Sequence, residues 1–180
     1  LGDSVKAGSY LSRFAKLLRK NLESINESYI TLNDELERLH LYLESEKMRL
    51  EERLHYNLHL ESGLNGDDIL VPSMIIQPLI ENAIWHGLMP KGSGMVQVLI
   101  TSLKEELKIE IIDNGIGINQ STKQSSKNTD RKHFGLHITT ERLKILERKL
   151  GKRVVFEIED LAEKGSSGTI VTIIIPFIYE

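Results

Sequence analysis

The sequence predicts an α+β fold, a two-layer sandwich with helices on one face of a mixed β-sheet, preceded by two helices. From about Leu54 onward the segments follow one another as strand, helix, two strands, polar loop, helix and two strands. Upstream, two stretches carry apolar residues at helical spacing. A chain of 180 residues is long enough for one core and a helical appendage of this kind.

The composition excludes several classes of protein. A content of 40% apolar and 27% charged residues is ordinary for a globular chain. A net charge of −3 gives no reason to expect nucleic acid or an anionic membrane as a partner. The absence of cysteine excludes disulfides, zinc–thiolate sites and thiol nucleophiles. No run approaches the roughly 18 apolar residues of a membrane span, and no signal peptide is visible.

The two upstream helices are expected at Tyr10–Ile25 and from Thr31 to about Arg49. Thr31 is a good N-cap for the second helix, and acidic residues such as Glu35 suit its positive end. Both stretches have an apolar stripe, which would pack on the other helix, on the following domain or across a dimer. We therefore expect residues 1–52 to form a helical linker or dimerisation region, and residues 53–180 to form the domain that follows.

The next expected elements are a strand at Arg53–Glu61 and a helix at Met74–His86, with Pro72 in the first turn of that helix. The apolar residues of this helix recur on one face, which predicts that it packs firmly on the core. Its other face carries Glu81, Asn82 and His86, and Mg²⁺ takes oxygen ligands of the kind that Asn82 and Glu81 offer. The alternative is that these three residues form the ordinary solvated face of an amphipathic helix.

Two further strands are expected at Met95–Leu103 and Leu107–Asp113. The second ends in D-N-G-I-G, which places Asp113, Gly115 and Gly117 31 to 35 residues after Asn82. An Asn-Gly pair is by itself an ordinary hairpin signal. A calcium loop is excluded, because the further acidic ligands do not follow.

A stretch without apolar side chains, residues 119–132, then predicts a surface loop. Beside a phosphate site it would act as a lid, and its basic side chains would close on the phosphates. A helix is expected to begin at His133–Leu136 and to run to about Leu150. A glycine at its start, Gly135, would offer free backbone N–H groups to phosphate.

The last two strands are expected at Arg153–Glu159 and Thr169–Ile178. The turn between them contains Gly168 and is also compatible with a simple hairpin. The segment Thr169–Ile175 is apolar on both faces, which predicts a central strand covered on both sides.

These motifs together resemble the sensor histidine kinases of the LytS-like family. The string Q-P-L-I-E-N-A-I-W-H-G resembles the N box, and D-N-G-I-G resembles the G1 box. The string H-F-G-L resembles the G2 box with His133 in place of its first glycine, and G-T at residues 168–169 resembles the G3 box. The resemblance covers nearly the whole chain and implies the Bergerat-type ATP-binding fold of the gyrase, histidine kinase and MutL superfamily.

The resemblance also implies roles for these residues. Asn82 would hold Mg²⁺ carried by ATP, Glu81 would act with it in catalysis, and Asp113 would accept a hydrogen bond from the adenine amino group. The remaining nucleotide contacts would come from His86, Gly115, Gly117, Gly135, Leu136, Gly168 and Thr169.

By the same resemblance the chain is the ATP- and Mg²⁺-binding catalytic portion of a two-component histidine kinase. The family's acceptor motif, similar to N-P-H-F-L-F-N, does not occur, so we expect the accepting histidine upstream and no autophosphorylation by this chain alone. The expected partners are a response regulator and a second copy of the full-length protein. The expected location is the cytoplasmic part of a membrane sensor, without membrane contact by this chain.

Two alternatives remain at this stage. One is an ATPase of the gyrase and MutL type, which hydrolyses ATP with a glutamate base. The other is a degenerate nucleotide-sensing or dimerisation module without kinase activity, which the unusual G2 box with His133 would suit.

Overall fold

The computed structural model describes residues 2–23, 27–120 and 129–179. Its centre is a five-stranded sheet with the strand order β2-β4-β5-β7-β6. The first pair, β2 and β4, is parallel and the other pairs are antiparallel. The sheet is therefore mixed, as predicted. Its strands are β2 (Leu54–Leu60), β4 (Gly94–Leu103), β5 (Glu106–Asp113), β6 (Val155–Asp160) and β7 (Thr169–Pro176).

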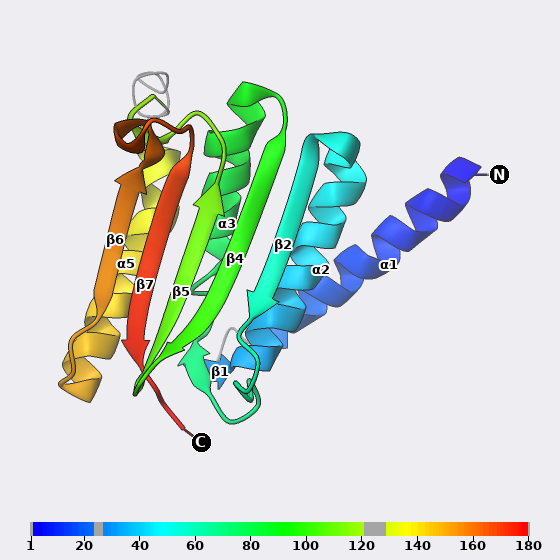
Figure 1. Cartoon of the computed structure of the whole chain (residues 1–180). Helices are drawn as coiled ribbons and strands as arrows, with labels where there is room; N and C mark the ends of the chain where they lie inside the picture. Colours follow the sequence, from blue (N-terminus) through cyan, green and yellow to red (C-terminus); the bar gives the residue numbers. More distant parts are fainter. Residues whose placement is uncertain (1, 24–26, 121–128, 180) are drawn as a thin grey trace.

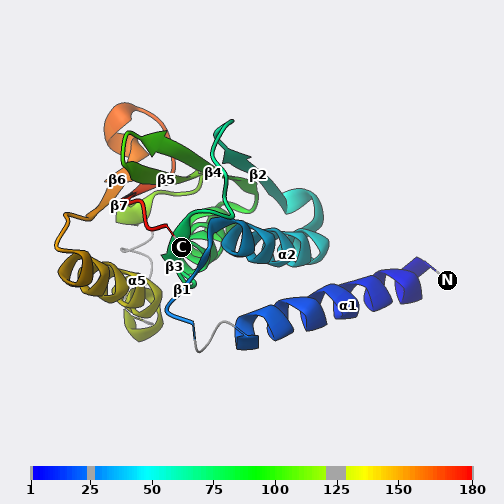
Figure 2. The ribbon, with the colours of Figure 1, turned by 90° about the horizontal axis from the view of Figure 1, so that it is seen from below.

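Helices cover one face of this sheet (Figures 1 and 2). They are α2 (Leu32–Leu50), α3 (Gln77–Asn82) with its continuation η3 (Ala83–Leu88), and α5 (Thr129–Leu150). Leu32, Leu39 and Leu43 of α2 and the isoleucines of the α3 segment are fully buried and belong to one core with the inward side chains of the strands. The predicted α+β sandwich is confirmed, and α2 is part of its core.

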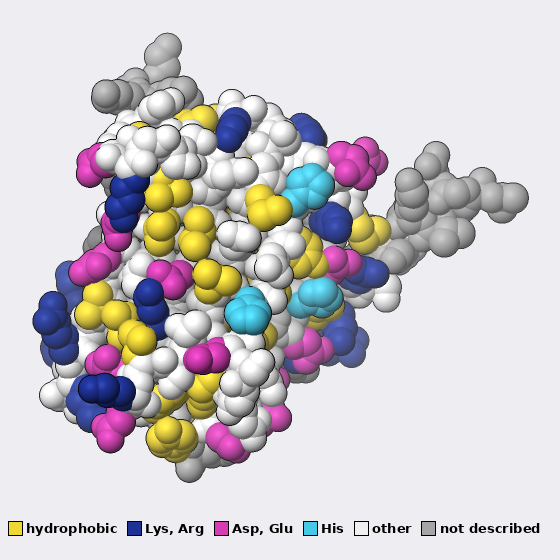
Figure 3. Space-filling model, in the orientation of Figure 1, with side chains coloured by type: hydrophobic (Ala, Val, Ile, Leu, Met, Phe, Trp, Pro, Cys, Tyr) yellow, Lys and Arg dark blue, Asp and Glu magenta, His cyan; other side chains and the backbone are white. Residues whose placement is uncertain are grey.

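The opposite face of the sheet is open, which corrects one prediction. Along β7 the side chains alternate between buried and half-buried positions, with Ile170, Thr172 and Ile174 on the open side. Hydrophobic side chains lie among charged and polar ones on this face (Figure 3). The strand is apolar on both sides, but helices cover only one of them.

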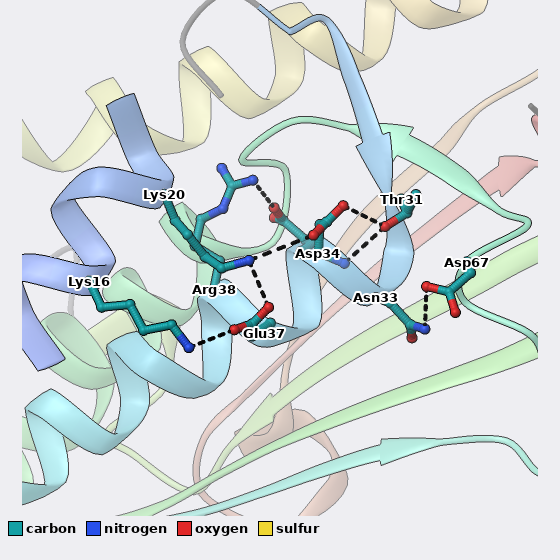
Figure 4. A network of polar contacts seen from close by, with 9 residues as sticks. Lys16, Lys20, Thr31, Asn33, Asp34, Glu37, Arg38 and Asp67 are labelled. Atoms are coloured by element: carbon teal, nitrogen blue, oxygen red, sulfur yellow. Dashed lines mark hydrogen bonds and ion pairs between the residues drawn. The ribbon is translucent and has the colours of Figure 1, made fainter. Parts of the chain in front are cut away.

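The first helix, α1 (Gly2–Glu23), lies outside α2 and its N-terminal end projects away from the rest of the chain (Figures 1 and 2). Leu17 is buried against the core. Around it, Lys16 and Lys20 pair with Glu37 of α2 at 2.9 and 2.7 Å (Figure 4). Leu11, Leu18 and Leu22 remain exposed.

The start of α2 agrees with the prediction. Thr31 is the N-cap, and its hydroxyl accepts the N–H of Asp34 at 3.0 Å. The same hydroxyl donates to the Asp34 carboxylate at 2.8 Å, so the two side chains close on each other. This arrangement differs from a capping box, in which the second side chain would reach the N-cap backbone.

Two short strands were not predicted. β1 (Tyr29–Thr31) pairs antiparallel with β3 (Leu70–Pro72), and the pair carries the chain from α1 into α2 and from β2 into α3. Pro72 therefore ends a strand, and Pro78 is the proline in the first turn of the helix. Three-residue strands are too short for an alternation pattern to distinguish them from loop.

The other short segments complete the order. They are the 3₁₀ turns η2 (Glu51–Arg53), η4 (Met89–Lys91) and η5 (Leu161–Lys164). In the described residues, no helix is both long enough and apolar enough to span a membrane.

Candidate nucleotide site

The helical segment Gln77–Leu88 presents its apolar face to the core as predicted. Ile80 and Ile84 are fully buried, and Glu81 and Asn82 are half-buried. Glu81 accepts a hydrogen bond from the Gln77 amide at 2.9 Å. The Asn82 amide nitrogen is buried without a hydrogen-bond partner among the described residues. The described residues therefore leave the donor of this amide without a partner.

The geometry of the segment changes directly after Asn82. Residues Ala83–Leu88 form a π-helical turn, with hydrogen bonds to the fifth preceding residue. The sequence predicted a regular α-helix as far as His86, which instead lies half-buried within the π turn. Apolar spacing alone could not distinguish the two, because a single wide turn displaces the pattern by only one residue. Such turns are frequent at functional sites.

Asp113, the last residue of β5, meets the other end of this segment. Its side chain is 4% exposed. Its Oδ1 atom accepts the backbone N–H of Gly115 at 2.8 Å. The Gly87 backbone lies directly against the same carboxylate, since a Cβ at Gly87 would be 2.8 Å from Oδ1. The N-box helix and the D-N-G-I-G loop, far apart in the sequence, therefore meet at this point.

Glycine is required at two places in this contact. A Cβ at Gly115 would lie 2.3 Å from the Gly87 carbonyl, and the next residue, Ile116, donates its N–H to that carbonyl at 3.0 Å. Gly168 has a φ of +120°, and a Cβ there would lie 1.8 Å from the Asp113 carbonyl. Only a chain without a Cβ approaches this closely. The structure therefore brings together Asp113, Gly115 and Gly168.

Thr169 lies between two carboxyl groups. In the register of the sheet it faces Asp113 on β5 and Asp160 on β6. Its hydroxyl and its backbone N–H both stabilise the charged form of the Asp113 carboxyl, which opposes the rise in pKa that burial causes. The predicted pair of Gly168 and Thr169 thus lies directly against Asp113.

Asp160 was not predicted as part of this site. It is 8% exposed, and it accepts the N–H groups of Asn119 at 2.8 Å and Ala162 at 2.9 Å. Gly117, with a φ of +82°, packs on the same carboxylate. Asp160 therefore fixes the end of the D-N-G-I-G loop. It belongs to no motif, and only its position at the end of a strand next to a turn signalled it.

Lys91 was also missed. Its ammonium group donates to the carbonyl of Asn114 at 2.5 Å and to the hydroxyl of Ser167 at 3.2 Å. Lys91 thus joins the end of the N-box region to the loop after β5 and to the loop before β7. In sequence it was one lysine in a turn-rich connection, and nothing there marked it.

The electrostatics of Asp113 follow from its burial. Loss of water raises the pKa of the carboxyl to about 6, from an ordinary value of 3.8. The hydrogen bonds from Gly115 and Thr169 oppose the rise, and the negative charge of Asp160 adds to it. At neutral pH the group is therefore mainly an ionised, partly desolvated acceptor.

The structure describes only part of the predicted lid and G2 region. Residues 121–128 of the predicted lid, with Lys123 and Lys127, lie outside the described residues. The helix α5 begins at Thr129, so Gly135 and Leu136 lie inside it and not at its start. The free N–H groups of its first turn therefore lie several residues earlier than predicted. Residues 129–132 have no apolar side chains, which predicted a loop, but they form the beginning of α5.

The residues present fit a bound Mg²⁺ that is also held by phosphates. No group of three or more acidic, histidine or cysteine side chains in the described residues forms a metal cage. Mg²⁺ characteristically binds through one or two protein oxygens, several waters and substrate phosphates. Asn82 and the neighbouring Glu81 supply such oxygens on one turn of a firmly packed helix.

Comparison with known proteins agrees with this geometry. The family described as histidine kinase-, DNA gyrase B-, and HSP90-like ATPase matches residues 67–178, and the histidine kinase family matches residues 1–54. The sensor protein LytS of Oceanobacillus iheyensis is 34% identical over 119 residues, which cover 66% of this chain and 20% of that protein. The chain thus spans about a fifth of the length of this relative.

Solved structures show the same fold. The histidine kinase domain of the blue-light activated kinase of Erythrobacter litoralis EL346 superimposes with a TM-score of 0.58 at 18% identity, covering 96% of this chain and 82% of the other. Histidine kinase ThkA, solved in complex with the response regulator protein TrrA, gives a TM-score of 0.55 at 16% identity. The superposition covers 95% of this chain and 49% of the other. The family match covers more than half of the chain and includes the whole candidate site, so the chain belongs to the histidine kinase-, DNA gyrase B- and HSP90-like ATPase family.

Proposed function

We propose that this chain is the catalytic portion of a two-component sensor histidine kinase, and that it binds ATP with Mg²⁺. The γ-phosphoryl group would pass to a histidine upstream of the chain and then to an aspartate of a response regulator. The observation that carries the proposal is the meeting of Asp113 with the end of the N-box helix at Gly87. It supports the proposal because Asp113, the proposed adenine acceptor, lies against the segment that carries Asn82.

Asp113 would recognise the adenine ring. Its buried carboxylate accepts a hydrogen bond from the exocyclic amino group, and water competes poorly for it there. Guanine has a carbonyl oxygen at the corresponding ring position. This oxygen and the carboxylate oxygen are both acceptors, so no hydrogen bond would form between them. The site therefore favours ATP over GTP.

Asn82 and Glu81 would act at the phosphate end. The Asn82 side-chain oxygen would hold Mg²⁺, which when bound neutralises charge on the phosphates. The Glu81 carboxylate would accept the N–H of the incoming imidazole, which directs the other ring nitrogen at the γ-phosphorus. His86, Gly115, Gly117, Gly168 and Thr169 would shape the nucleotide contacts, with Gly135 and Leu136 of α5 on the phosphate side.

A titration calorimetry experiment tests the proposal. We expect the chain to bind ATP in the presence of MgCl₂, and the Asp113→Asn and Asn82→Ala variants to bind at least about tenfold more weakly. The matched controls Asp67→Asn and Asn57→Ala change exposed residues of the same types and would bind like the wild type. No binding by the wild type would favour the degenerate sensing module and contradict the kinase.

Two further outcomes separate the remaining alternatives. Rapid release of inorganic phosphate that is lost on Glu81→Ala would favour an ATPase of the gyrase and MutL type. Incorporation of labelled phosphate into the isolated chain would contradict an acceptor histidine located upstream. His40 would then be the first residue to test, since it lies exposed on α2 beside Tyr56.

The partner and the location follow from the same proposal. The exposed side of α1 carries Leu11, Phe14, Leu18 and Leu22 at helical spacing, and we propose that the full-length protein dimerises through this stripe. Residues 1–52 would then serve as linker and dimerisation region, with α2 packed into the core of the ATP-binding domain that residues 53–180 form. The chain would work in the cytoplasm as part of a membrane sensor, without touching the membrane or nucleic acid.

A further inference from the structure

Three side chains of α2 point at the N-box helix, and they are spaced seven residues apart: Glu35, Tyr42 and Arg49. Seven residues are almost two turns of a helix, or about 10 Å, so these side chains lie along one stripe. Glu35 contacts the beginning of the segment from Met74 to Trp85, and the other two lie at its end. The sequence motifs assigned no role to any of the three.

Glu35 holds the beginning of the segment. It is fully buried, and its two oxygens accept the backbone N–H groups of Met74 and Ile76 at 3.3 and 3.2 Å. The helix α3 has no side-chain cap of its own at Ile76. A carboxylate from another helix therefore takes the place of the N-cap, and Arg38 lies 3.8 Å behind it.

Tyr42 and Arg49 hold the end of the segment. Tyr42 is 8% exposed; burial raises the pKa of its hydroxyl, and a side-chain interaction with the Trp85 indole opposes that rise. The Arg49 guanidinium lies over the face of the same indole, 4.3 Å from the ring centre, and pairs with Glu46. Trp85 lies in the π turn, one helical turn beyond Glu81. The negative charge of Glu81 also contributes to the raised pKa of Tyr42.

A π turn is less favourable than an α turn and persists where its surroundings support it. Here the turn directly follows Asn82, so its hydrogen bonding determines the angle at which Glu81 and Asn82 leave the helix. The contacts from α2 lie on both sides of that point. We propose that α2 is a positioning element for the N box, and that Tyr42 holds the turn bearing Glu81 in its working orientation through Trp85.

This inference rests on the proposed kinase function, because it concerns the orientation of Glu81 during phosphoryl transfer. Tyr42 does not touch the nucleotide in this account. Its removal should therefore change the rate of transfer and leave the affinity for ATP almost unaltered. A displacement of a catalytic group by a fraction of an ångström is enough to slow a reaction about tenfold.

The test uses Tyr42→Phe, which keeps the buried ring and removes the hydroxyl. The matched control is Tyr56→Phe, which removes a tyrosine hydroxyl bonded to Glu44 elsewhere on α2. Trp85 is the only tryptophan in the sequence, so its fluorescence reports the contact directly. Four quantities are measured: Trp85 emission and ATP affinity in this chain, and kcat and KM for autophosphorylation in the full-length protein.

For Tyr42→Phe we expect a shifted Trp85 emission, an ATP dissociation constant within about twofold of wild type, and a kcat lowered about tenfold at constant KM. Tyr56→Phe should leave all of these unchanged. In a Glu81→Gln background, Tyr42→Phe should slow transfer no further, because it acts through Glu81. Arg49→Ala, at an exposed position, should lower kcat about threefold and provides a second variant if Tyr42→Phe folds poorly.

An unchanged kcat beside a shifted Trp85 emission would overturn the inference. A parallel loss of ATP affinity and kcat would overturn it too, since that would indicate general distortion. Failure of the proposed function looks different: the wild type itself would bind no ATP or transfer no phosphate.

Discussion

Two buried carboxyl groups lie at opposite ends of the segment Met74–Leu88, and they differ in what surrounds them. Glu35 at its beginning is fully enclosed and accepts two backbone N–H groups with Arg38 behind it. Asp113 at its end is lined by glycine backbone and retains 4% exposure. Burial raises the pKa of both groups.

The difference lies in how each neighbourhood is built. Around Glu35 the partners belong to the scaffold and leave no room for a ligand. Around Asp113, a Cβ at Gly87 would crowd the carboxylate, and a Cβ at Gly115 would displace the Gly87 backbone that packs on it. A buried carboxyl among saturating donors stabilises a fold, whereas Asp113, which packs against glycine backbone, is the group that we propose as the acceptor for a ligand. The predictions below test this distinction in order of decreasing effect.

The largest effect is expected from Glu35→Ala. It leaves two buried N–H groups and the Arg38 guanidinium without their acceptor, and breaking such a buried pair costs about 3 kcal/mol or more. Urea unfolding followed by circular dichroism measures this. The control Glu37→Ala removes a carboxylate two residues away that is paired with Lys16 and Lys20 near the surface, and should cost less than about 1 kcal/mol. Equal losses for the two variants would contradict the assignment of Glu35 to the scaffold.

Asp113→Asn should have the reverse effect: it should weaken ATP binding and leave the stability of the fold almost unchanged. It removes an ionised acceptor from the nucleotide site, so the affinity for ATP should fall by about tenfold or more. The free energy of unfolding should change by less than about 1 kcal/mol, because asparagine keeps an acceptor oxygen and removes a buried charge. A strong loss of stability with unchanged affinity would make Asp113 a scaffold residue like Glu35.

The pH dependence of ATP affinity and of stability further separates a carboxyl that binds a ligand from one that stabilises the fold. With a pKa near 6, Asp113 is ionised above that pH, so the affinity for ATP should be highest there and fall by up to about tenfold per pH unit below it. The stability of the ligand-free chain should change in the opposite direction. A carboxyl with a raised folded-state pKa stabilises the fold below its unfolded pKa, near 3.8, and that contribution is lost as the pH rises through about 6.

Calorimetry at a series of pH values measures the affinity for ATP. The ATP phosphates also titrate in this pH range and contribute to the dependence of affinity on pH. Asp113→Asn is therefore the control, since any slope that it retains belongs to the phosphates. If wild type and variant show the same slope, Asp113 does not control binding.

The smallest effect is expected from Asp160→Asn. The negative charge of Asp160 contributes to the raised pKa of Asp113, so its removal should move the midpoint of ATP binding to lower pH by a fraction of a unit. The loss of a charged acceptor for Asn119 and Ala162 should also weaken ATP binding about threefold. A midpoint that moves upward would show that Asp160 does not act on Asp113 through its charge.

The comparison also shows what the sequence predicts and what it does not. Five sheet strands and the helical segments were predictable because alternation and helical spacing extend over whole elements. Asp113 was singled out because D-N-G-I-G resembles the G1 box of the kinases, and the structure places it against the N-box segment. Glu35 looked like any acidic residue in a first helical turn, since its partners Met74 and Ile76 are about forty residues away.

Other features were hidden for local reasons. The π turn after Asn82 depends on one displaced hydrogen bond, and apolar spacing does not report it. The pair β1 and β3 is too short for a pattern, and Pro72 fits a strand end as well as a helix start. The start of α5 at Thr129 was missed because a polar helix and a polar loop have similar composition. Each of these depends on a tertiary contact or on a few residues of backbone.

A structure of the chain with Mg²⁺ and a non-hydrolysable ATP analogue tests the central claim most directly. The account predicts the adenine amino group within hydrogen-bonding distance of the Asp113 carboxylate, and the metal on the Asn82 side-chain oxygen. It would be contradicted by a nucleotide bound elsewhere, for example in the groove of about 410 Å³ between β1, β3 and α5 that Arg142 and Lys149 line.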